Sequence, residues 1–253
     1  MSGSLVVIGL GPGDPEWMTV ESRALIDASS DFFGYAPYLA RLSLRPDQRA
    51  HASDNREERA RAEAALRLAA QGARVAVVSG GDPGVFAMAA ALVEAIEAGP
   101  AQWRTLDFRV SPGVSAMQGA AARLGAPLGH DFCAISLSDN LKPWAIVARR
   151  LTAAAEGDFV IALYNPASKA RPDSIVAAFA LLRAIQGSEI AVALARAVGR
   201  PDERLVVTTL GAVDASLVDM ATLVIVGSSQ TRFIARPGRS TLMLTPRAYE
   251  SAR

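Results

Sequence analysis

The sequence predicts an α/β protein of two domains with mostly parallel or mixed sheets. Short β-branched or apolar runs alternate with alanine-rich helical patterns along the 253 residues, and this alternation is typical of βα units. The segment Ser111–Val114 follows a strand-like run, contains Pro-Gly and lies near the middle of the chain, which marks it as the best candidate hinge. We therefore predict one domain over residues 1–112 and a second over residues 113–253.

The expected strands fall on short apolar runs. Several of these runs are apolar on both faces, as in strands buried within a parallel sheet. They are Leu5–Ile8, Arg74–Val78, Thr105–Val110, Phe132–Leu137, Phe159–Tyr164, Ile190–Leu194, Arg204–Thr209 and Leu223–Val226. The tail after Arg236 carries two prolines and a glycine, so we expect one strand at most there, followed by a frayed end.

The clearest helix is expected over Arg56–Gln71, where apolar residues recur every three to four positions. Glu57/Arg61 and Glu63/Arg67 are spaced for ion pairs along it, and Gly72 supplies its end. The other expected helices begin near Thr19, at Pro83 with Asp82 as N-cap, and at Ser115 with Gln118 in capping-box spacing, or span Ala145–Ala155 and Ser174–Ile185.

Composition excludes several functional classes. Lysine plus arginine (26) nearly balance aspartate plus glutamate (25), so no global charge draws the chain to nucleic acid or an anionic membrane. A single cysteine, Cys133, and two histidines leave no internal disulfide and no cysteine-based zinc cluster, and they fit a reducing compartment. With no apparent signal peptide or membrane-spanning run, we expect a cytoplasmic protein without a bound metal.

Two glycine-rich segments follow predicted strands. Gly9–Asp14 approaches a dinucleotide fingerprint, but Asp14 replaces the third glycine and Pro12 removes a donor, so a plain tight turn is an equal alternative. Ser79–Gly84 lacks the Gly-Lys-Ser/Thr of a nucleotide-binding loop. Its glycines could expose backbone groups to an adenosyl or amino-acid moiety, although capping by Asp82 alone also explains the pattern.

Other residue types point less directly to chemistry. Polar strand ends at Ser136–Asn140, Tyr164–Lys169 and Gly227–Arg232 are weak pointers to a ligand, with plain turns as the alternative. Cys133 reads as a core residue. His130 and Asp131 could form an acid/base pair, but neighbours on a strand point to opposite faces, so we expect no contact between them. No hydrolase elbow or zinc motif is present in the sequence.

In order and spacing, a set of segments resembles the tetrapyrrole methylase family over nearly the whole chain: Gly9–Asp14, Gly80–Gly84, Ser111–Ala116 and Leu163–Pro166. A second set resembles the branch of that family that methylates C17 of precorrin-3B, with ring contraction to precorrin-4 on the way to cobalamin: Asp54–Glu58, Ala122–Phe132, Ile135–Asp139, Tyr164–Lys169 and Ser229–Arg232. The resemblance implies two α/β domains that form a central cleft, S-adenosylmethionine folded in that cleft, and a homodimer. It also implies that Gly9–Asp14 lies by the tetrapyrrole and the cofactor and is not a dinucleotide cradle.

The resemblance also carries site residues onto this chain. Those implied to bind the cofactor are Leu10, Pro12, Gly80, Gly81, Asp82, Val85, Phe86, Ser115, Ala116, Tyr164, Asn165, Ala197 and Val198. Gly11 and Gly13 are implied to lie by the substrate. Because precorrins carry many carboxylates and arginine binds carboxylates through paired hydrogen bonds, we expect further substrate contacts from Arg41, Arg45, Arg49, Arg56, Lys169, Arg171 and Arg232.

The expected chemistry needs little catalytic machinery. Methyl transfer from a sulfonium is an in-line displacement, so the enzyme mainly aligns the reactants and excludes water, and no protein nucleophile is required. Ring contraction additionally needs a base for the C20 hydroxyl proton. The candidates are Asp14, Asp139 and His130, with Asp14 first because its loop is expected to face the macrocycle.

Three alternatives stay open from the sequence. The first is methylation of another precorrin carbon without ring contraction, or of another substrate altogether, because cofactor loops do not encode which atom is attacked. The second is a nicotinamide oxidoreductase built on Gly9–Asp14, with Asp31 as the ribose partner. The third is a tetrapyrrole carrier that keeps the fold without the chemistry.

Overall fold

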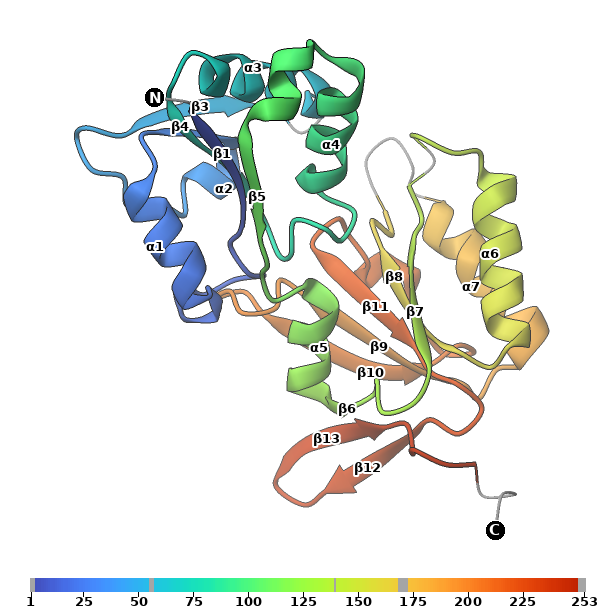
Figure 1. Cartoon of the computed structure of the whole chain (residues 1–253). Coiled ribbons are helices and arrows are strands. Elements are labelled where there is room, and N and C mark those ends of the chain that lie inside the picture. Colours follow the sequence, from blue (N-terminus) through green and yellow to red (C-terminus); the bar gives the residue numbers. More distant parts are fainter. Residues whose placement is uncertain (1–2, 55–56, 139, 168–172, 250–253) are drawn as a thin grey trace. The chain divides into compact units, whose positions relative to one another are not determined.

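A computed structural model describes residues 3–54, 57–138, 140–167 and 173–249 of the chain (Figure 1). The chain divides into two compact units, Met1–Ala116 and Met117–Arg253. The predicted boundary after residue 112 falls slightly before this division, which comes at the first residue of helix α5 (Ala116–Leu124).

Unit 1 holds a five-stranded sheet in the order β3-β2-β4-β1-β5, with every pairing parallel. Its strands are β1 (Ser4–Gly9), β2 (Asp31–Tyr35), β3 (Arg49–Ser53), β4 (Arg74–Ser79) and β5 (Asp107–Ser111). Because neighbouring parallel strands end at the same edge, the segments that follow β4, β1 and β5 leave the sheet side by side. These segments are the glycine-rich turns.

Helices cover both faces of this sheet, which explains why its central strands are apolar on both sides. On one face, α3 (Glu58–Ala70) and α4 (Met88–Ala98) pack with Leu5 and Val7 of β1. On the other, α1 (Val20–Ala28) and α2 (Ala36–Leu39) pack with Val6 and Ile8. Successive side chains of a strand point to opposite faces, so β1 contributes to both cores.

Helix α3 confirms one predicted ion pair and corrects the other. Arg67 lies 3.5 Å from Glu63. Arg61 is only 4% exposed, and its guanidinium donates to Ser53 Oγ at 2.8 Å and to the carbonyl of Asp54 at 2.6 Å. The Glu57 carboxylate instead accepts from the Asp54 backbone N–H at 3.0 Å. The predicted Glu57–Arg61 side-chain pair was therefore wrong, because Arg61 points into the core side of the helix.

Unit 2 holds a mixed sheet in the order β10-β9-β11-β8-β7. Its strands are β7 (Phe132–Ser136), β8 (Val160–Tyr164), β9 (Ala191–Arg196), β10 (Arg204–Thr209) and β11 (Thr222–Val226). Only β7 and β8 pair in parallel, and the other pairings within this sheet are antiparallel. Helices α6 (Trp144–Glu156) and α7 (Ser174–Gln186) share its hydrophobic core.

The tail after Arg236 contains one strand among the described residues, β13 (Arg239–Leu244), as expected. It forms an antiparallel hairpin with β12 (Arg232–Arg236), a strand that was not predicted, and it also pairs with the two-residue strand β6 (Gly125–Ala126). Gly238 adopts φ 67° and turns the chain back on itself between β12 and β13.

The helix after Ser79–Gly84 begins later than predicted. Its first residue is Met88, with Ala87 as N-cap, and not Pro83 with Asp82 as N-cap. Phe86 lies before it with φ 52°, which is incompatible with a right-handed helix. By contrast, the start near Thr19 is confirmed, since Thr19 Oγ1 accepts the Ser22 N–H at 3.0 Å as the N-cap of α1.

Candidate functional site

Three glycine-rich turns come together at one edge of the sheet in unit 1. Gly11 and Gly81 form an antiparallel bridge, with N···O distances of 3.2 Å and 2.9 Å. A Cβ placed on Gly113 would lie 2.3 Å from the Gly81 carbonyl oxygen and 3.0 Å from Gly9 Cα. Only glycine fits such a close approach of backbones. The turns after β1, β4 and β5 therefore form one patch walled by main-chain atoms, which we call the triple-glycine patch.

Asp82 ties two of these turns together. Its Oδ1 accepts the Gly84 N–H at 2.8 Å and its Oδ2 accepts the Gly113 N–H at 2.9 Å. An aspartate that accepts from the residue two positions later closes a turn of its own, which competes with helix capping. Asp82 therefore acts as a link between the turns after β4 and β5.

A network of buried hydroxyl groups contacts the backbone of the triple-glycine patch. Ser22 Oγ donates to the Gly9 carbonyl at 3.2 Å and lies 3.1 Å from Ser111 Oγ. Ser111 Oγ in turn donates to Glu21 Oε2 at 3.1 Å. Both serines are at most 1% exposed. Sequence reasoning missed this network, and its one signal was the capped start of α1 at Thr19, which places Ser22 in the first turn.

The geometry of the first turn also argues against a dinucleotide cradle. The Gly11 N–H is donated to Gly81, and Pro12 has no N–H to offer a pyrophosphate. A dinucleotide fingerprint depends on free backbone donors at this place. This observation supports the family-based interpretation of Gly9–Asp14.

The Arg41 guanidinium donates hydrogen bonds to three backbone carbonyls of the first turn. Its Nη2 donates to the Leu10 and Gly13 oxygens at 2.8 Å and 2.7 Å, and its Nη1 donates to the Gly11 oxygen at 3.1 Å. Arg41 was predicted as a ligand of substrate carboxylates. In the structure its guanidinium fixes the shape of the loop that contains Gly11 and Gly13, and the role of carboxylate ligand stays a prediction.

This contact gives a test of Arg41. In an Arg41→Met variant, we expect the free energy of unfolding to fall by about 2 kcal/mol, because the loop carbonyls lose charge-assisted hydrogen bonds. Urea denaturation measures this change. Arg45→Met is the matched control, since Arg45 pairs with the exposed carboxylates of Asp27 and Asp47 and such pairs contribute little. Unchanged stability of Arg41→Met, with a raised KM for the tetrapyrrole, would show that Arg41 acts as a carboxylate ligand and does not fix the loop.

Backbone strain gathers at predicted cofactor residues. Among the described residues, non-glycine positions with positive φ are Phe86 (52°), Asp158 (55°), Asn165 (51°) and Ala197 (51°). Holding an ordinary residue in this region costs about 1–2 kcal/mol. Strain of this kind concentrates at ligand-binding and catalytic sites. Phe86, Asn165 and Ala197 were all predicted to contact the cofactor.

In unit 2, the ends of the two parallel strands are joined by side chains. Asn165 Nδ2 donates to Ser136 Oγ at 3.0 Å, and the Leu137 N–H donates to the Tyr164 carbonyl at 2.9 Å. The Tyr164 hydroxyl accepts the Met117 N–H at 3.0 Å in helix α5. Tyr164 and Asn165 thus stand at the carboxyl ends of parallel strands, where open α/β sheets bind ligands.

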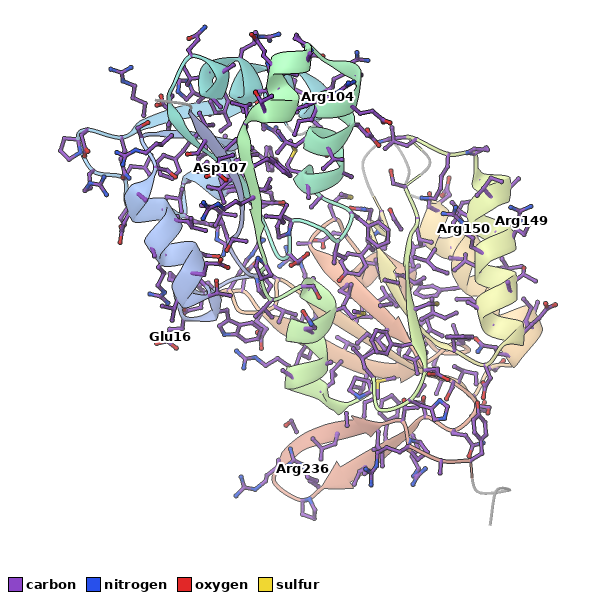
Figure 2. All side chains as sticks on the ribbon, in the orientation of Figure 1. Glu16, Arg104, Asp107, Arg149, Arg150 and Arg236 are labelled. Atoms are coloured by element: carbon purple, nitrogen blue, oxygen red, sulfur yellow. The ribbon has the colours of Figure 1, made fainter. Side chains whose placement is uncertain are left out.

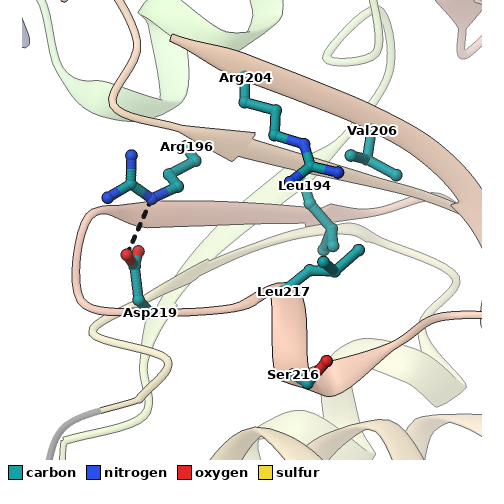
Figure 3. A pocket seen from close by; sticks show the side chains of 7 residues that line it. All are labelled: Leu194, Arg196, Arg204, Val206, Ser216, Leu217 and Asp219. Atoms are coloured by element: carbon teal, nitrogen blue, oxygen red, sulfur yellow. Dashed lines mark hydrogen bonds and ion pairs between the residues drawn. The ribbon is translucent and has the colours of Figure 1, made fainter. Parts of the chain in front are cut away.

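A second feature of unit 2 follows strand β9. A surface hollow of about 220 Å³ is lined by Leu194, Arg196, Arg204, Val206, Ser216, Leu217 and Asp219 (Figure 3). Arg196, the last residue of β9, precedes Ala197 and Val198, which are 4% and 5% exposed. Sequence reasoning flagged the two small residues and missed the ion pairs around Arg196, because Asp219 comes from a distant loop.

The predicted bases have other contacts. Asp14 is exposed, and its Oδ1 accepts the Glu16 N–H at 2.8 Å at the start of a short 3₁₀ helix. His130 lies before β7, where its Nδ1 accepts the Asp131 N–H at 2.8 Å and lies 3.8 Å from Asp131 Oδ2. The expectation of no contact was wrong, because strand alternation does not apply before the strand begins. Asp139 lies outside the described residues.

The predicted substrate cations are only partly placed by the structure. Arg45 is exposed beside Asp47, 3.1 Å away. Arg49 on β3 and Arg232 on β12 are exposed and form no ion pair within the part of the chain that is described. Arg56, Lys169 and Arg171 lie outside the described residues. Cys133 is half-buried against the core of unit 2, as expected, and burial raises the pKa of its thiol.

Asp158 organises the loop after α6. Its carboxylate accepts from the Ser229 N–H, the Ser229 hydroxyl and the Tyr249 hydroxyl, each at 2.7 Å. Burial acts to raise the pKa of Asp158, but these hydrogen bonds outweigh it and hold the pKa below its usual value. Sequence reasoning missed this cluster, although Ser229 lies in one of the polar segments that it marked.

The lowered pKa of Asp158 predicts a pH dependence. A carboxyl group whose pKa is lower in the folded state stabilises the fold above its unfolded pKa, and this contribution is lost as pH falls through the folded value. We expect wild type to lose thermal stability below about pH 4, and Asp158→Asn to show a smaller loss. Melting temperatures between pH 7 and pH 3 measure both, with Glu156→Gln, an exposed neighbour, as control. Identical acid profiles for Asp158→Asn and wild type would contradict the assignment.

Within the described ranges, no three or more histidine, cysteine, aspartate or glutamate side chains are grouped to hold a metal ion. No helix there is long and apolar enough to cross a bilayer. Arg149 and Arg150 project from α6 and Arg236 from β12 (Figure 2), so these basic residues belong to separate elements.

Comparison with known proteins identifies relatives of the whole chain. Residues 4–214 match the family model of Tetrapyrrole (Corrin/Porphyrin) Methylases. The chain is 58% identical over 252 residues to a Precorrin-3B C(17)-methyltransferase from Sinorhizobium sp, covering 100% of this chain and 99% of that protein. Its fold matches the crystal structure of the methyltransferase CobJ with a TM-score of 0.92 and 46% identity, over 97% of this chain and 100% of the other.

A more distant structure shares the fold alone. It is uroporphyrin-III C-methyl transferase from Thermus thermophilus, complexed with S-adenyl homocysteine. The TM-score is 0.67 at 22% identity, over 89% of this chain and 97% of that one.

Proposed function

The chain belongs to the tetrapyrrole (corrin/porphyrin) methylase family, and from that membership we propose that it methylates C17 of precorrin-3B. In this reaction S-adenosylmethionine supplies the methyl group, and the ring contracts to give precorrin-4 in cobalamin biosynthesis. The observation that carries the proposal is the 58% identity over the full length to a protein of that named activity. A methylase with this substrate agrees with the expectation from the family resemblance.

We propose that the triple-glycine patch supplies main-chain contacts to the cofactor in unit 1. The residues assigned to it are Leu10, Pro12, Gly80, Gly81, Asp82, Val85, Phe86, Ser115 and Ala116. In unit 2 the assigned residues are Tyr164, Asn165, Ala197 and Val198. Two observations support this assignment: the close approach of Gly9, Gly81 and Gly113, and the positive φ at Phe86, Asn165 and Ala197.

A site of this kind suits methyl transfer. The sulfonium already activates the methyl carbon, so fixed backbone dipoles that orient the donor serve better than a nucleophilic side chain. Gly11 and Gly13 stay assigned to the substrate, with exposed cations such as Arg45, Arg49 and Arg232 as candidates for its carboxylates. Asp14 stays the first candidate for the base of ring contraction, since its exposed carboxylate accepts a single local hydrogen bond among the described contacts and keeps acceptor capacity.

We also propose that the protein acts in the cytoplasm and as a homodimer. Support for the compartment is the single cysteine, which fits a reducing environment. Support for the dimer is family resemblance. Sedimentation at several concentrations tests the assembly.

Incubation of the protein with precorrin-3B and methyl-labelled S-adenosylmethionine tests the proposed reaction. Mass spectrometry and carbon NMR of the product are expected to show one labelled methyl at C17 and a contracted macrocycle. Label at another carbon would favour the first alternative, and binding of precorrin without use of the donor would favour a carrier. Titration with S-adenosylhomocysteine and with NAD separates the methylase from the oxidoreductase.

The incubation with precorrin-3B also tests Asp14 as the base. The Asp14→Asn variant is expected to lose precorrin-4 formation, and a normal product would eliminate Asp14 as the base.

A further inference from the structure

The turn between β9 and β10 is held in an unusual conformation. Ala197 follows β9 with φ 51°, and its N–H donates to the Ala221 carbonyl at 2.9 Å. The Arg200 N–H then donates to the Ala197 carbonyl at 3.0 Å. The left-handed residue is thus fixed through both of its main-chain polar groups. Alanine has no intrinsic preference for this region, so the surrounding contacts must stabilise it.

Arg196 supplies such a contact. Its Nε donates to Asp219 Oδ2 at 2.8 Å, as Figure 3 shows, and its Nη1 donates to Asp202 Oδ2 at 2.7 Å. Asp202 belongs to the turn that contains Ala197, whereas Asp219 belongs to the loop before β11. One guanidinium therefore joins the two loops on either side of the strained residue.

The acceptor on the far loop is itself held in place. Asp219 Oδ1 accepts the Thr222 hydroxyl at 2.8 Å and the Ala221 N–H at 3.0 Å. Ala221 is the residue whose carbonyl accepts from Ala197. The path from Arg196 to the strained turn therefore runs through Asp219 and Ala221 by hydrogen bonds of ordinary length.

The charges of this cluster support the geometry. Hydrogen bonds from Arg196 hold the pKa of Asp202 below its usual value. Burial acts to raise the pKa of Asp219, but hydrogen bonds from Thr222 and Arg196 outweigh it and the pKa is lowered. The hydrogen bonds to Asp202 and Asp219 raise the pKa of Arg196. All three groups are therefore charged at neutral pH.

A second carboxylate closes the turn from its other end. Glu203 Oε2 accepts the Gly199 N–H at 2.6 Å, and Glu203 Oε1 lies 3.1 Å from Arg123 Nε of helix α5. Residues 197–203 are thus tied down by Arg196 at one side and Glu203 at the other. A turn fastened in this way presents a preformed backbone surface.

We propose that Arg196 is a positioning residue for cofactor binding, which acts by bridging Asp202 and Asp219 so that Ala197 and Val198 keep the conformation that meets the cofactor. This inference rests on the proposed function, in which Ala197 and Val198 contact S-adenosylmethionine. Exposed ion pairs contribute little to global stability, about 0–1 kcal/mol. Arg196 is therefore expected to affect ligand affinity far more than folding.

The test compares Arg196→Gln with wild type by isothermal titration with S-adenosylhomocysteine. We expect about tenfold weaker binding for Arg196→Gln, which corresponds to about 1.4 kcal/mol. Arg196→Lys is expected to fall between the two, because one ammonium cannot reach both carboxylates with the guanidinium geometry. In the methylation assay, KM for S-adenosylmethionine is expected to rise while kcat at saturation stays unchanged.

Arg204→Gln is the matched control. Arg204 pairs with Arg196 across the two strands and lines the same hollow, yet it forms no ion pair within the described part of the chain. Its replacement removes the same charge from the same face, and we expect binding equal to wild type. Equal loss of affinity in Arg196→Gln and Arg204→Gln would reduce the effect to surface charge and overturn the inference.

The other possible outcomes of the titration also support or overturn the inference. If wild type binds S-adenosylhomocysteine and Arg196→Gln binds it as tightly, this inference alone is wrong. If wild type does not bind it, the proposed function fails, and the inference fails with it. Should circular dichroism show that Arg196→Gln is unfolded, Asp202→Asn replaces it, because Asp202 is exposed and lies at the end of the bridge. Weaker binding by folded Asp202→Asn supports the inference, and unchanged binding overturns it.

Discussion

Replacing Gly113 with alanine is expected to lower the free energy of unfolding by about 3 kcal/mol. The added Cβ would lie 2.3 Å from the Gly81 carbonyl oxygen and 3.0 Å from Gly9 Cα. Both neighbours are backbone atoms, which cannot rotate aside as a flexible side chain can. The turn after β5 must therefore move away from the other two turns, and the triple-glycine patch opens.

Urea denaturation measures this loss of stability. Alanine variants of two other glycines serve as comparisons. Gly81→Ala places a Cβ no closer than 3.8 Å to any atom, although φ is +70°, so it is expected to lose only about 1–2 kcal/mol through backbone strain. The Cβ of Gly84→Ala would meet only a side-chain atom, Asp82 Oδ1, at 3.1 Å, and no backbone atom within 4 Å. If Gly113→Ala is as stable as Gly84→Ala, the three turns do not pack as described.

Removal of the Asp82 carboxylate is expected to weaken S-adenosylhomocysteine binding between tenfold and a hundredfold. Asp82→Ala leaves the N–H groups of Gly84 and Gly113 without their acceptors. Each lost hydrogen bond of this kind costs about 1–3 kcal/mol, and 1.4 kcal/mol corresponds to a factor of ten in affinity. The turns would then lose the arrangement in which Gly80, Gly81 and Ser115 are proposed to contact the cofactor.

Titration calorimetry measures this loss, and Asp82→Asn refines it. An amide has one carbonyl oxygen, so it can keep only one of the two acceptor positions and is expected to give an intermediate affinity. Asp107→Ala is the control, because Asp107 lies at the opposite end of β5 and pairs with Arg109 on the surface. Wild-type binding by Asp82→Ala would show that the link between the turns does not matter for the cofactor.

Several of the strands that sequence patterns predicted are almost fully buried and apolar. Leu5–Ile8 lies within β1, and Leu223–Val226 lies within β11. β2 and β3 were missed for a physical reason. β2 begins with Asp31 and contains Gly34, whose missing side chain makes room for Val78. β3 reads Arg-Ala-His-Ala-Ser at the sheet edge, where little apolar surface is needed.

The direction of strands was predictable in unit 1 and only partly in unit 2. Parallel neighbours need a long crossover, usually a helix. In unit 2 no helix was expected between Ile190–Leu194 and Arg204–Thr209, and the short connection there forces β9 and β10 to run antiparallel. The absence of a helical pattern between these two strands therefore already predicts that they run antiparallel.

The candidate site was predictable in its main-chain parts and less so in its side chains. Glycine-rich segments after strands mark close backbone approaches, and those at Gly9, Gly81 and Gly113 do meet. The partners of charged residues depend on chain segments far apart in sequence. Arg41 reaches Leu10, and Arg196 reaches Asp219, and no local pattern announces either contact.

The place of β1 within its sheet has a consequence for biosynthesis. Ser4 stands in register with both Arg74 and Asp107. The strand of this sheet that is synthesised first, β1, therefore pairs with two strands that are synthesised much later. Until Ser111 has been made, the edge of β1 that pairs with β5 has no partner, and unpaired strand edges favour aggregation. Such distant pairings slow folding. During synthesis, the first sheet of the chain is therefore completed only after β5 has been made.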